Sequence, residues 1–385
     1  LHLLIDASRA KNVYVSLTPR EREVLALLRS QPSLDAAGLA ALLGTTKGAV
    51  AVVLSSLSAK GEIVGRGYLL RDQASAVVIG GAAWDIKAHS RAAARLHTSN
   101  PSTVVQTPGG VGRNIAEGIA RLGDRVYLVA AVGADPAGRE LLSRTAEAGV
   151  LVDQVQISAH PTGSYLAALD DSGELIIGMA DFAATDNLDP AVMSRSQDLV
   201  SRSDVVVLDG NLPAAVLEWA LAVTAGSGVR AVVEPVSVAK AGRLAALLDA
   251  QHPVFTITPN VDELAALVDH PVADDPDQLV AAAAELHQRG VTYVWVSRGA
   301  AGSLLIGADD VVTIAAESVE VIDVTGAGDA MTAGYVHALL AGEPAATAAR
   351  WGHLAAALTL ASPQTVRPDL GVAFAARLHT EGAHR

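Results

Sequence analysis

The chain has 385 residues, half of them apolar, and a formal net charge of −13. This length exceeds one ordinary domain and suits a large α/β domain accompanied by a small one. The absence of cysteine excludes disulfide bonds, cysteine-ligated zinc and thiol catalysis. No stretch approaches the roughly 18 apolar residues that a membrane span requires, and residues 1–15, which we leave unassigned, lack the flanks of a signal peptide. We therefore expect a soluble, cytoplasmic protein with no membrane partner.

Charge is divided unevenly along the chain. Residues 1–72 carry nine basic and six acidic side chains, which leaves a net charge of −16 on the remaining residues. An acidic body disfavours broad nucleic-acid binding by the larger part of the chain. The mildly basic first part leaves such binding open there.

Residues 16–72 have the pattern of a small helical domain. Thr18, Pro19 and Glu21 have the spacing of a capping box at the start of a first helix. A second helix is expected over 35–43, and a third from a threonine at 45 or 46 to about residue 59. Residues 61–70 alternate and contain glycines, as a short hairpin does. Three helices followed by a hairpin resemble a winged helix-turn-helix.

In that resemblance the third helix reads DNA, with Thr46, Lys47, Ala49 and Val50 near its exposed start. Base-reading faces usually carry arginine, asparagine or glutamine, whereas this helix offers one lysine among small residues. The domain is therefore a candidate for DNA binding, and a dimerisation module or a relic is the alternative.

From residue 73 to residue 385 the pattern changes to apolar strands alternating with helical stretches. The expected strands lie at 76–81, 125–133, 204–210, 230–235, 254–260 and 292–299. Such alternation predicts a mostly parallel sheet covered by helices on both faces. Because ligands bind beyond the carboxyl ends of such strands, the polar residues there are the candidates for a site.

The string at 323–330, Asp-Val-Thr-Gly-Ala-Gly-Asp-Ala, is the strongest chemical signal, and a helix is expected to follow it. Glycines at a helix start make the N–H groups of Gly326, Ala327 and Gly328 available as an anion hole. An acid inside such a hole suits phosphoryl transfer, because Asp329 can accept the proton of an attacking hydroxyl while the N–H groups hold the phosphoryl charge. With a reference pKa of about 4, Asp329 is expected to be ionised.

This string resembles the nucleotide-side signature of ribokinase-like (PfkB) carbohydrate kinases, and further motifs follow in the family's order. The resemblance implies a ribokinase-like fold, with Asp329 as the catalytic base. It also implies that Asp85, at the end of the first strand, and Asn114 bind hydroxyl groups of the substrate. Gly109 and Gly110 match the Gly-Gly motif that lets the sugar approach the backbone.

Two later motifs match the family's nucleotide side. Asn260-x-x-Glu263 matches the motif that organises Mg²⁺ and phosphate through water, so Glu263 would contact the metal through water. Ser297, Gly299 and Gly302 match a strand-to-turn segment that touches the nucleotide phosphates. The resemblance thus implies ATP and Mg²⁺ as cofactors.

A monovalent-cation site is also implied. In the family it is built partly from backbone carbonyls of the segment that matches Asp323 and Thr325, so activation by K⁺ is expected. Its second half falls near 361–367, where individual ligands are not assigned.

A lid is predicted at about 87–107 and 162–182. Residues 164–169 and 174–179 flank a turn sequence and form a hairpin, which a strand near 103–107 extends into a small sheet. Such a lid excludes water from the pocket. Asp181 is a candidate ligand to the sugar or base, and the family's dimerisation through this sheet implies a homodimer.

Within the family, strings at 99–101, 131–142, 234–237 and 368–370 most resemble pseudouridine kinases. The resemblance implies phosphoryl transfer from ATP to the 5′-hydroxyl of pseudouridine. Ala83 and Ala180 replace asparagines usual in that subgroup, Trp84 adds a bulky indole, and Glu234 replaces an aspartate. A ribokinase or another sugar or nucleoside kinase is therefore the runner-up, and a DNA-binding regulator that uses the kinase domain as a metabolite sensor is a further alternative.

Overall fold

The computed structural model describes residues 17–31, 34–60, 62–65, 69–70 and 74–382. Contacts divide the chain into two compact units, Leu1–Gln73 and Ala74–Arg385. Residues 1–15 and part of the expected hairpin at 61–70 lie outside the described residues. Within these ranges no single helix is long and apolar enough to cross a membrane, and Ala36–Leu42 with Lys47–Ala59 passes that test only as a pair bent by 112°.

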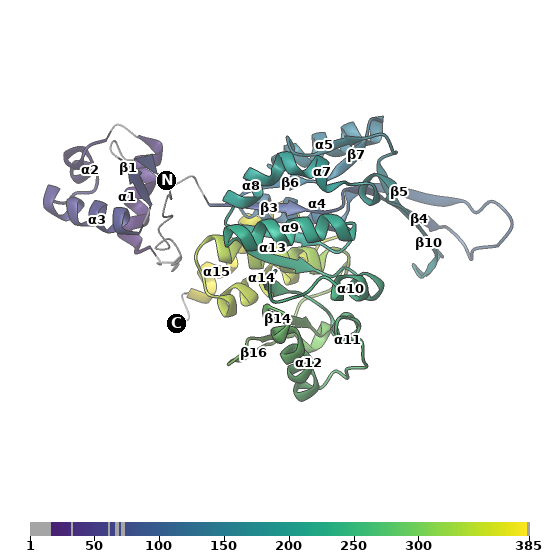
Figure 1. Ribbon diagram of the computed structural model, residues 1–385. Helices are drawn as coiled ribbons and strands as arrows, with labels where there is room; N and C mark the ends of the chain where they lie inside the picture. The colour runs from purple at the N-terminus through teal and green to yellow at the C-terminus, as the bar shows by residue number, and fades with distance from the viewer. Residues whose placement is uncertain (1–16, 32–33, 61, 66–68, 71–73, 383–385) are drawn as a thin grey trace, which may run out of the picture. The chain divides into compact units, whose positions relative to one another are not determined.

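In its described residues the first unit contains three helices and two short antiparallel strands (Figure 1). These elements are α1 (Pro19–Ser30), α2 (Ala36–Leu42), α3 (Lys47–Ala59), β1 (Ile63–Gly65) and β2 (Leu69–Leu70). The predicted capping box is present, since Thr18 Oγ1 accepts a hydrogen bond from Glu21 N and Glu21 Oε2 accepts one from Thr18 N. Thr46 caps α3.

The core of this unit is apolar, and the unit also buries the carboxylate of Glu21. Its main side chains are Val24, Leu25, Leu28, Leu39, Val50, Leu54 and Leu57. Val50 therefore faces the core and not the exposed start of α3, so its expected place on the DNA-reading face is wrong. Hydrogen bonds from Lys60 and Ser56 to Glu21, both 2.7 Å, hold the pKa of Glu21 down at about 2.

The second unit is built on an eight-stranded sheet of order β16-β15-β14-β13-β12-β11-β3-β6. All neighbours from β14 to β6 pair parallel, whereas β15 runs in the opposite direction and pairs antiparallel with both β14 and β16. The strands are β3 (Ser75–Ile79), β6 (Arg125–Val129), β11 (Val205–Asp209), β12 (Arg230–Glu234), β13 (Val254–Ile257), β14 (Val291–Ser297), β15 (Ser303–Ile306) and β16 (Val311–Ile314). This is the mostly parallel sheet that the sequence predicts.

Helices cover both faces of this sheet, because alternate side chains of each strand point to opposite faces. On β3, Val77 and Ile79 join one apolar core, and Ala76 and Val78 join the other. The first face is covered by α7 (Pro190–Met193), α8 (Gln197–Arg202), α9 (Ala214–Ser227), α10 (Val238–Ala245), α11 (Val261–Val268) and α12 (Pro276–Gln288). The second is covered by α4 (Val111–Arg121), α5 (Pro136–Glu147), α13 (Ala327–Leu340) and α14 (Ala345–Leu360). The remaining described elements are α6 (Ala183–Asp186), η2 (Ser194–Ser196), η3 (Gly299–Ala301), α15 (Leu370–Gly382) and the pair β7 (Ala131–Gly133) and β8 (Gln156–Ser158).

A second sheet, of order β10-β9-β4-β5, forms the lid and projects from the body of this unit (Figure 1). Its strands are β4 (Ala83–Ser90), β5 (Ser102–Gly109), β9 (Gly163–Leu169) and β10 (Leu175–Asp181). The lid begins earlier than predicted, because the chain leaves β3 at Gly80 and enters β4 at Ala83. Asp85 therefore lies within the lid sheet, and its expected place at the end of the first strand is wrong.

Candidate active site

The glycine-rich string lies where the chain enters α13. Gly326 has a left-handed φ of 80°, and a Cβ there would overlap the carbonyl oxygen of Thr365, so this position requires glycine. The helix begins at Ala327, within the string and not after it. At its start, Ala330 N donates a hydrogen bond to Gly326 O at 2.9 Å. Asp329 thus lies in the first turn, where the helix dipole favours negative charge.

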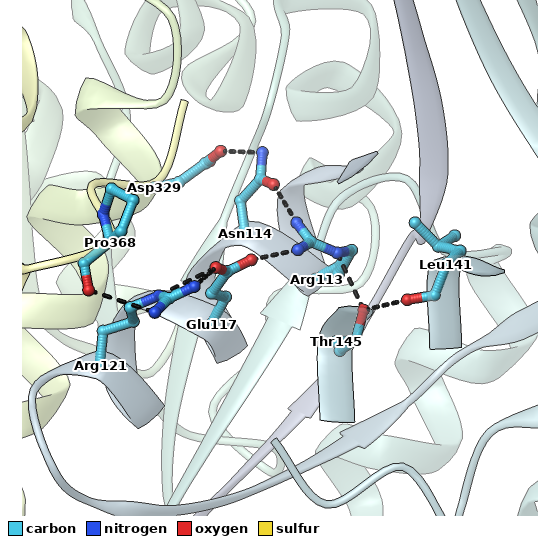
Figure 2. Close-up of polar contacts among 8 residues, drawn as sticks. All are labelled: Arg113, Asn114, Glu117, Arg121, Leu141, Thr145, Asp329 and Pro368. Carbon is cyan, nitrogen blue, oxygen red and sulfur yellow. Dashed lines mark hydrogen bonds and ion pairs between the residues drawn. The ribbon is translucent and has the colours of Figure 1, made fainter. Parts of the chain in front are cut away.

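Asp329 is hydrogen-bonded to the first turn of α4. Asn114 Nδ2 donates to Asp329 Oδ2 at 2.9 Å (Figure 2). The helix follows Gly109 and Gly110, and Gly110 has a φ of 90°. A Cβ on Gly109 would overlap the carboxylate of Asp85, so this glycine allows the lid carboxylate to approach the start of α4.

Arg113 continues this network on the other side of Asn114 (Figure 2). Its side chain is buried, Nη1 donates to Asn114 Oδ1 and Nε donates to Thr145 Oγ1, both at 3.0 Å. Nη2 forms an ion pair with Glu117, which also accepts from Arg121 at 2.8 Å. Residues of α4 and α5 thus hold the amide that contacts Asp329.

A second carboxylate, Asp209 at the end of β11, is completely buried. Its Oδ2 accepts hydrogen bonds from the backbone N–H groups of Gly81 and Gly112, both at 2.9 Å, and its Oδ1 accepts from Asn211 N at 2.7 Å. Burial raises the pKa of Asp209, and these donors oppose the rise. Asp209 therefore joins the chain after β3 to the start of α4, which positions Asn114.

The surroundings of Asp329 change its ionisation. Burial raises its pKa to about 7, the hydrogen bond from Asn114 opposes the rise, and the negative charges of Asp209 and Asp85 add to it. The expectation from the reference pKa that Asp329 is fully ionised is therefore wrong near neutral pH for the site without bound ligands. A general base is most effective with a pKa close to the working pH.

Glu234, at the end of β12, belongs to the same group of acids. Burial raises its pKa to about 8, the hydrogen bond from Thr258 Oγ1 at 2.6 Å opposes the rise, and the negative charges of Glu263 and Asp329 add to it. The carboxyl group of Glu234 is thus repelled by the carboxyl groups of Glu263 and Asp329.

The lid covers a cavity of about 880 Å³. Its lining includes Lys87, His89, Thr103, Val105, Thr107, Arg113, Glu117, Arg121, Arg144, Leu169, Asp323, Gln364 and Thr365. The register pairs Asp85 with Thr107 and Tyr165, so these side chains share the lid face that carries Lys87. A Cβ on Gly178 would lie 2.7 Å from the Tyr165 hydroxyl, so this glycine makes room for the ring across β10.

The two motifs expected on the nucleotide side are adjacent. Asn260 Oδ1 accepts from Glu263 N, and Glu263 Oε2 accepts from Asn260 N, both at 2.9 Å, so the motif forms a capping box of α11. Asn260 also forms a β-bridge with Ser297. Gly299 and Gly302 follow with φ values of 55° and 83°. The structure thus brings these residues together beyond β13 and β14.

The expected cation segment contacts the lid. Asp323 Oδ1 accepts from Thr325 N at 2.8 Å. Lys87 Nζ lies 3.3 Å from Asp323 Oδ2 and donates to Thr325 Oγ1 at 3.2 Å. Ile322 N donates to Leu360 O at 2.8 Å, so this segment runs beside the start of residues 361–367.

Asp181 lies apart from these groups. The strand register places Asp181 on the same lid face as Trp84 and opposite Asp85. Its Oδ1 accepts from Ala183 N at 3.0 Å, and Trp84 Nε1 donates to Ala137 O of α5 at 2.9 Å. The structure therefore joins neither side chain to Asn114 and Asp329, and the indole does not enter the space beside Asp85.

Sequence reasoning missed Asp209, Arg113, Lys87 and Tyr165. Asp209 ends an apolar strand, which is the position where ligand-binding side chains were expected, so a signal was present. Arg113 stands directly before Asn114, but a residue of such a string gives no sign of its partners on α5. The face of a lid strand is fixed by register, which the sequence of a single strand leaves open.

Comparison with known proteins identifies the family of this chain. The model of the pfkB family of carbohydrate kinases matches residues 73–370. An Escherichia coli K12 protein named uncharacterized sugar kinase YeiI is 33% identical over 355 residues, covering 91% of this chain and 96% of its own length. The pseudouridine kinase of the same organism is 33% identical over 312 residues, covering 79% of this chain and 96% of its own length.

Solved structures show the same fold. A carbohydrate kinase from Agrobacterium tumefaciens is similar with a TM-score of 0.69 and 29% identity, covering 80% of this chain and 97% of that one. The Arabidopsis thaliana ribokinase complexed with ribose and ATP is similar with a TM-score of 0.70 and 22% identity, covering 78% of this chain and 98% of that one. The fold is thus ribokinase-like, and the chain belongs to the pfkB family of carbohydrate kinases, the sugar and nucleoside kinases.

Proposed function

We propose that this kinase transfers the γ-phosphoryl group of ATP to a nucleoside, with the 5′-hydroxyl of pseudouridine as the first candidate acceptor. The observation that carries the proposal is the position of Asp329. Its carboxylate lies in the first turn of α13, is hydrogen-bonded to Asn114 at 2.9 Å, and is near enough to Asp85 for that charge to raise its pKa.

In the proposed reaction each part of the site has one task. Asp85 and Asn114 hold hydroxyl groups of the acceptor, which places one further hydroxyl against Asp329. Asp329 accepts the proton of that hydroxyl as its oxygen attacks the γ-phosphorus and the bond to the β-phosphate oxygen breaks. The N–H groups of Gly326, Ala327 and Gly328 hold the charge of the transferring phosphoryl group.

ATP and Mg²⁺ would bind beyond β12, β13 and β14. Mg²⁺ keeps several waters and is held in proteins by one or two carboxylates together with substrate phosphates. Glu263 and Glu234 would hold it, Glu263 through water. The metal would neutralise phosphate charge, and Ser297, Gly299 and Gly302 would contact the nucleotide phosphates.

A K⁺ site is proposed at the backbone of Asp323 and Thr325. Its two halves are adjacent, because residue 322 is hydrogen-bonded to Leu360 and Gly326 lies against Thr365. The ammonium group of Lys87 already approaches the Asp323 carboxylate there. Rates measured in sodium-free buffers with and without K⁺ test the proposal, and equal rates would contradict it.

The cavity supports a nucleoside rather than a free pentose as acceptor. Its volume of about 880 Å³ lies in the upper part of the range of small-molecule sites, and its lining includes Lys87 and Thr107, which share the lid face of Asp85. Tyr165 shares the lid face of Asp85 and would offer an aromatic surface to a planar base. The 33% identity to a pseudouridine kinase makes pseudouridine the first base to test.

A panel of acceptors tests this assignment. The protein is incubated with Mg-ATP and, separately, pseudouridine, uridine, ribose and fructose, and the products are identified by mass. We expect pseudouridine 5′-phosphate to form fastest and the Asp329→Asn variant to form almost none. Phosphorylation of ribose alone would contradict the nucleoside assignment and favour the runner-up, a ribokinase.

We also propose that two copies of the chain pair through the lid. Its strands expose large apolar side chains, namely Val104, Val105, Leu175, Ile176, Ile177 and Met179. An exposed apolar surface of this kind marks an interaction site. Light scattering of the full chain should give the mass of a dimer, and the double substitution Leu175→Asp with Ile177→Asp should give a monomer.

For the first unit we propose a winged helix that binds DNA, so that the kinase unit could act as a metabolite sensor. Three helices followed by a short antiparallel strand pair support it, and Lys47 and Ala49 are exposed at the start of α3. The match to the sugar kinase relative covers 91% of this chain. Residues 73–385 are a smaller share than that, so the match extends into the first unit. Salt-dependent retardation of DNA from the protein's own operon should disappear when residues 1–72 are removed, and no retardation at low salt would contradict the proposal.

A further inference from the structure

Asn114 stands between the guanidinium group of Arg113 and the carboxyl group of Asp329. A guanidinium group can only donate, and an ionised carboxylate can only accept. Arg113 Nη1 donates to Asn114 Oδ1 at 3.0 Å, so the oxygen of the amide is turned towards the arginine. The nitrogen of the same amide then faces Asp329 and donates to Oδ2 at 2.9 Å (Figure 2).

Arg113 is itself held on its other sides. It is 2% exposed, its Nε donates to Thr145 Oγ1 at 3.0 Å, and Thr145 donates in turn to Leu141 O at 2.6 Å. Its second terminal nitrogen is paired with Glu117, which Arg121 also contacts. The guanidinium group cannot turn away from Asn114 without breaking these buried contacts, so it is a rigid support.

We infer that Arg113 is a positioning residue for the reaction: by holding the oxygen of the Asn114 amide, it keeps the amide nitrogen on the Asp329 carboxylate. The inference rests on the proposed function of Asp329 as the base. Without Arg113, either end of the amide can face Asp329. An amide oxygen there would accept a hydrogen bond from the protonated carboxyl group and so favour the form that cannot act as a base.

Charged groups face Asp329 from four elements. These are Arg113 on α4, Asp85 on β4, Asp209 on β11 and Glu234 on β12. The negative charges of Asp209 and Asp85 favour the protonated form of Asp329, whereas the arginine and the Asn114 donor favour the ionised form. Loss of Arg113 therefore raises the pKa of Asp329, and the base becomes ionised only at higher pH.

The test is a titration of Asp329 in the full unliganded chain carrying ¹³C at the aspartate carboxyl carbons. The Asp329 signal is assigned by its loss in Asp329→Asn. In Arg113→Met we expect the midpoint of this signal to move up by about one pH unit. The acid limb of kcat/KM should move by the same amount, while the KM for ATP stays within about twofold of the wild type.

Repeating the titration without Asn114 separates orientation from charge. If Arg113 acts through Asn114, Arg113→Met should move the midpoint much less in an Asn114→Ala background than in the wild type. Equal shifts in the two backgrounds would mean that Arg113 acts by its charge alone, and would overturn the inference. An unshifted midpoint in folded Arg113→Met would overturn it as well.

Two further variants guard against a purely structural effect. Thr145→Val removes another contact of Arg113 but leaves its bond to Asn114, so its midpoint should match the wild type, and a shift equal to that of Arg113→Met would overturn the inference. If Arg113→Met does not fold, Arg113→Met with Glu117→Gln removes the unpaired charge and serves instead.

The titration needs no substrate, so it separates this inference from the proposed function. A shifted midpoint in a protein that phosphorylates none of the acceptor panel would refute the proposed acceptors and support the positioning role. An unshifted midpoint in an active kinase would refute the positioning role alone.

Discussion

The central sheet and the lid sheet of the second unit each carry one half of the candidate site, and the two sheets differ in how deeply their strands are buried. All five residues of β11 are buried, whereas all seven of β10 are exposed. Asp329 and Asn114 are fixed by hydrogen bonds at the packed sheet, while Asp85 and Tyr165 stand on the lid. A reacting group needs a rigid support, and a recognition surface tolerates change. We therefore expect substitutions beside the central sheet to reduce turnover, and substitutions in the lid to change substrate binding.

The largest effect is expected for Asp329→Asn. Loss of the base should reduce kcat by about 10²–10⁴-fold and leave the KM of both substrates nearly unchanged. Steady-state kinetics measure this, with Asp171→Asn in the exposed lid turn as a matched control of normal activity. Near-normal turnover of Asp329→Asn would show that Asp329 is not the base. It would also contradict the expectation that residues beside the central sheet, rather than those of the lid, determine turnover.

The next effect is expected for Asp85→Asn on the lid. A hydrogen bond to a charged group contributes about 1.5–3 kcal/mol, so kcat/KM should fall by about 10–100-fold, mainly through a higher KM for the acceptor. The KM for ATP serves as the internal control. A fall in kcat as large as that of Asp329→Asn would show that the lid carries chemistry as well as recognition.

A smaller effect is expected for Tyr165→Ala. If a base lies against the ring, the KM for a nucleoside should rise about tenfold, because stacking of a base on an aromatic side chain contributes about 1–3 kcal/mol. Activity on ribose, measured in the same assay at high concentration, should be unchanged. Equal losses for both acceptors would assign Tyr165 to the structure of the lid.

The smallest effect is a pH dependence set by the central sheet. Because burial raises the pKa of Asp329 to about 7, the ionised base is lost as the pH falls through 7. We expect kcat/KM to fall about fivefold between pH 7 and pH 6. Rates over roughly pH 5.5–8, within the range in which proteins tend to be most stable, check this, and a flat profile down to pH 5.5 would contradict the raised pKa.

The glycine positions of the candidate site could be predicted from sequence, because its glycine motifs are local. Gly109, Gly110 and Gly326 are required by left-handed backbone or by close approach, and such requirements leave a mark in a short string. Asn114 and Asp329, 215 positions apart, could be paired only through the resemblance to a family. The alternation of strands and helices likewise predicted the parallel sheet.

The remaining features depend on contacts that no short string encodes. Asp209 binds the N–H group of Gly81 from a distance of 128 positions, and its burial follows from the packing of both faces of the sheet. The raised pKa of Asp329 has the same origin. For Asp181, a one-residue difference in strand register decides which lid face it occupies.

The proposed transfer to a hydroxyl group held against Asp329 is tested most directly by a crystal structure of the protein with pseudouridine and a non-hydrolysable ATP analogue. We predict that one hydroxyl oxygen of the nucleoside lies within about 2.6–3.2 Å of the Asp329 carboxylate and in line with the γ-phosphate. Other hydroxyl groups of the same molecule should be bound by Asp85 and Asn114. A nucleoside bound by Asp85 with every hydroxyl group out of reach of Asp329 after lid closure would contradict it.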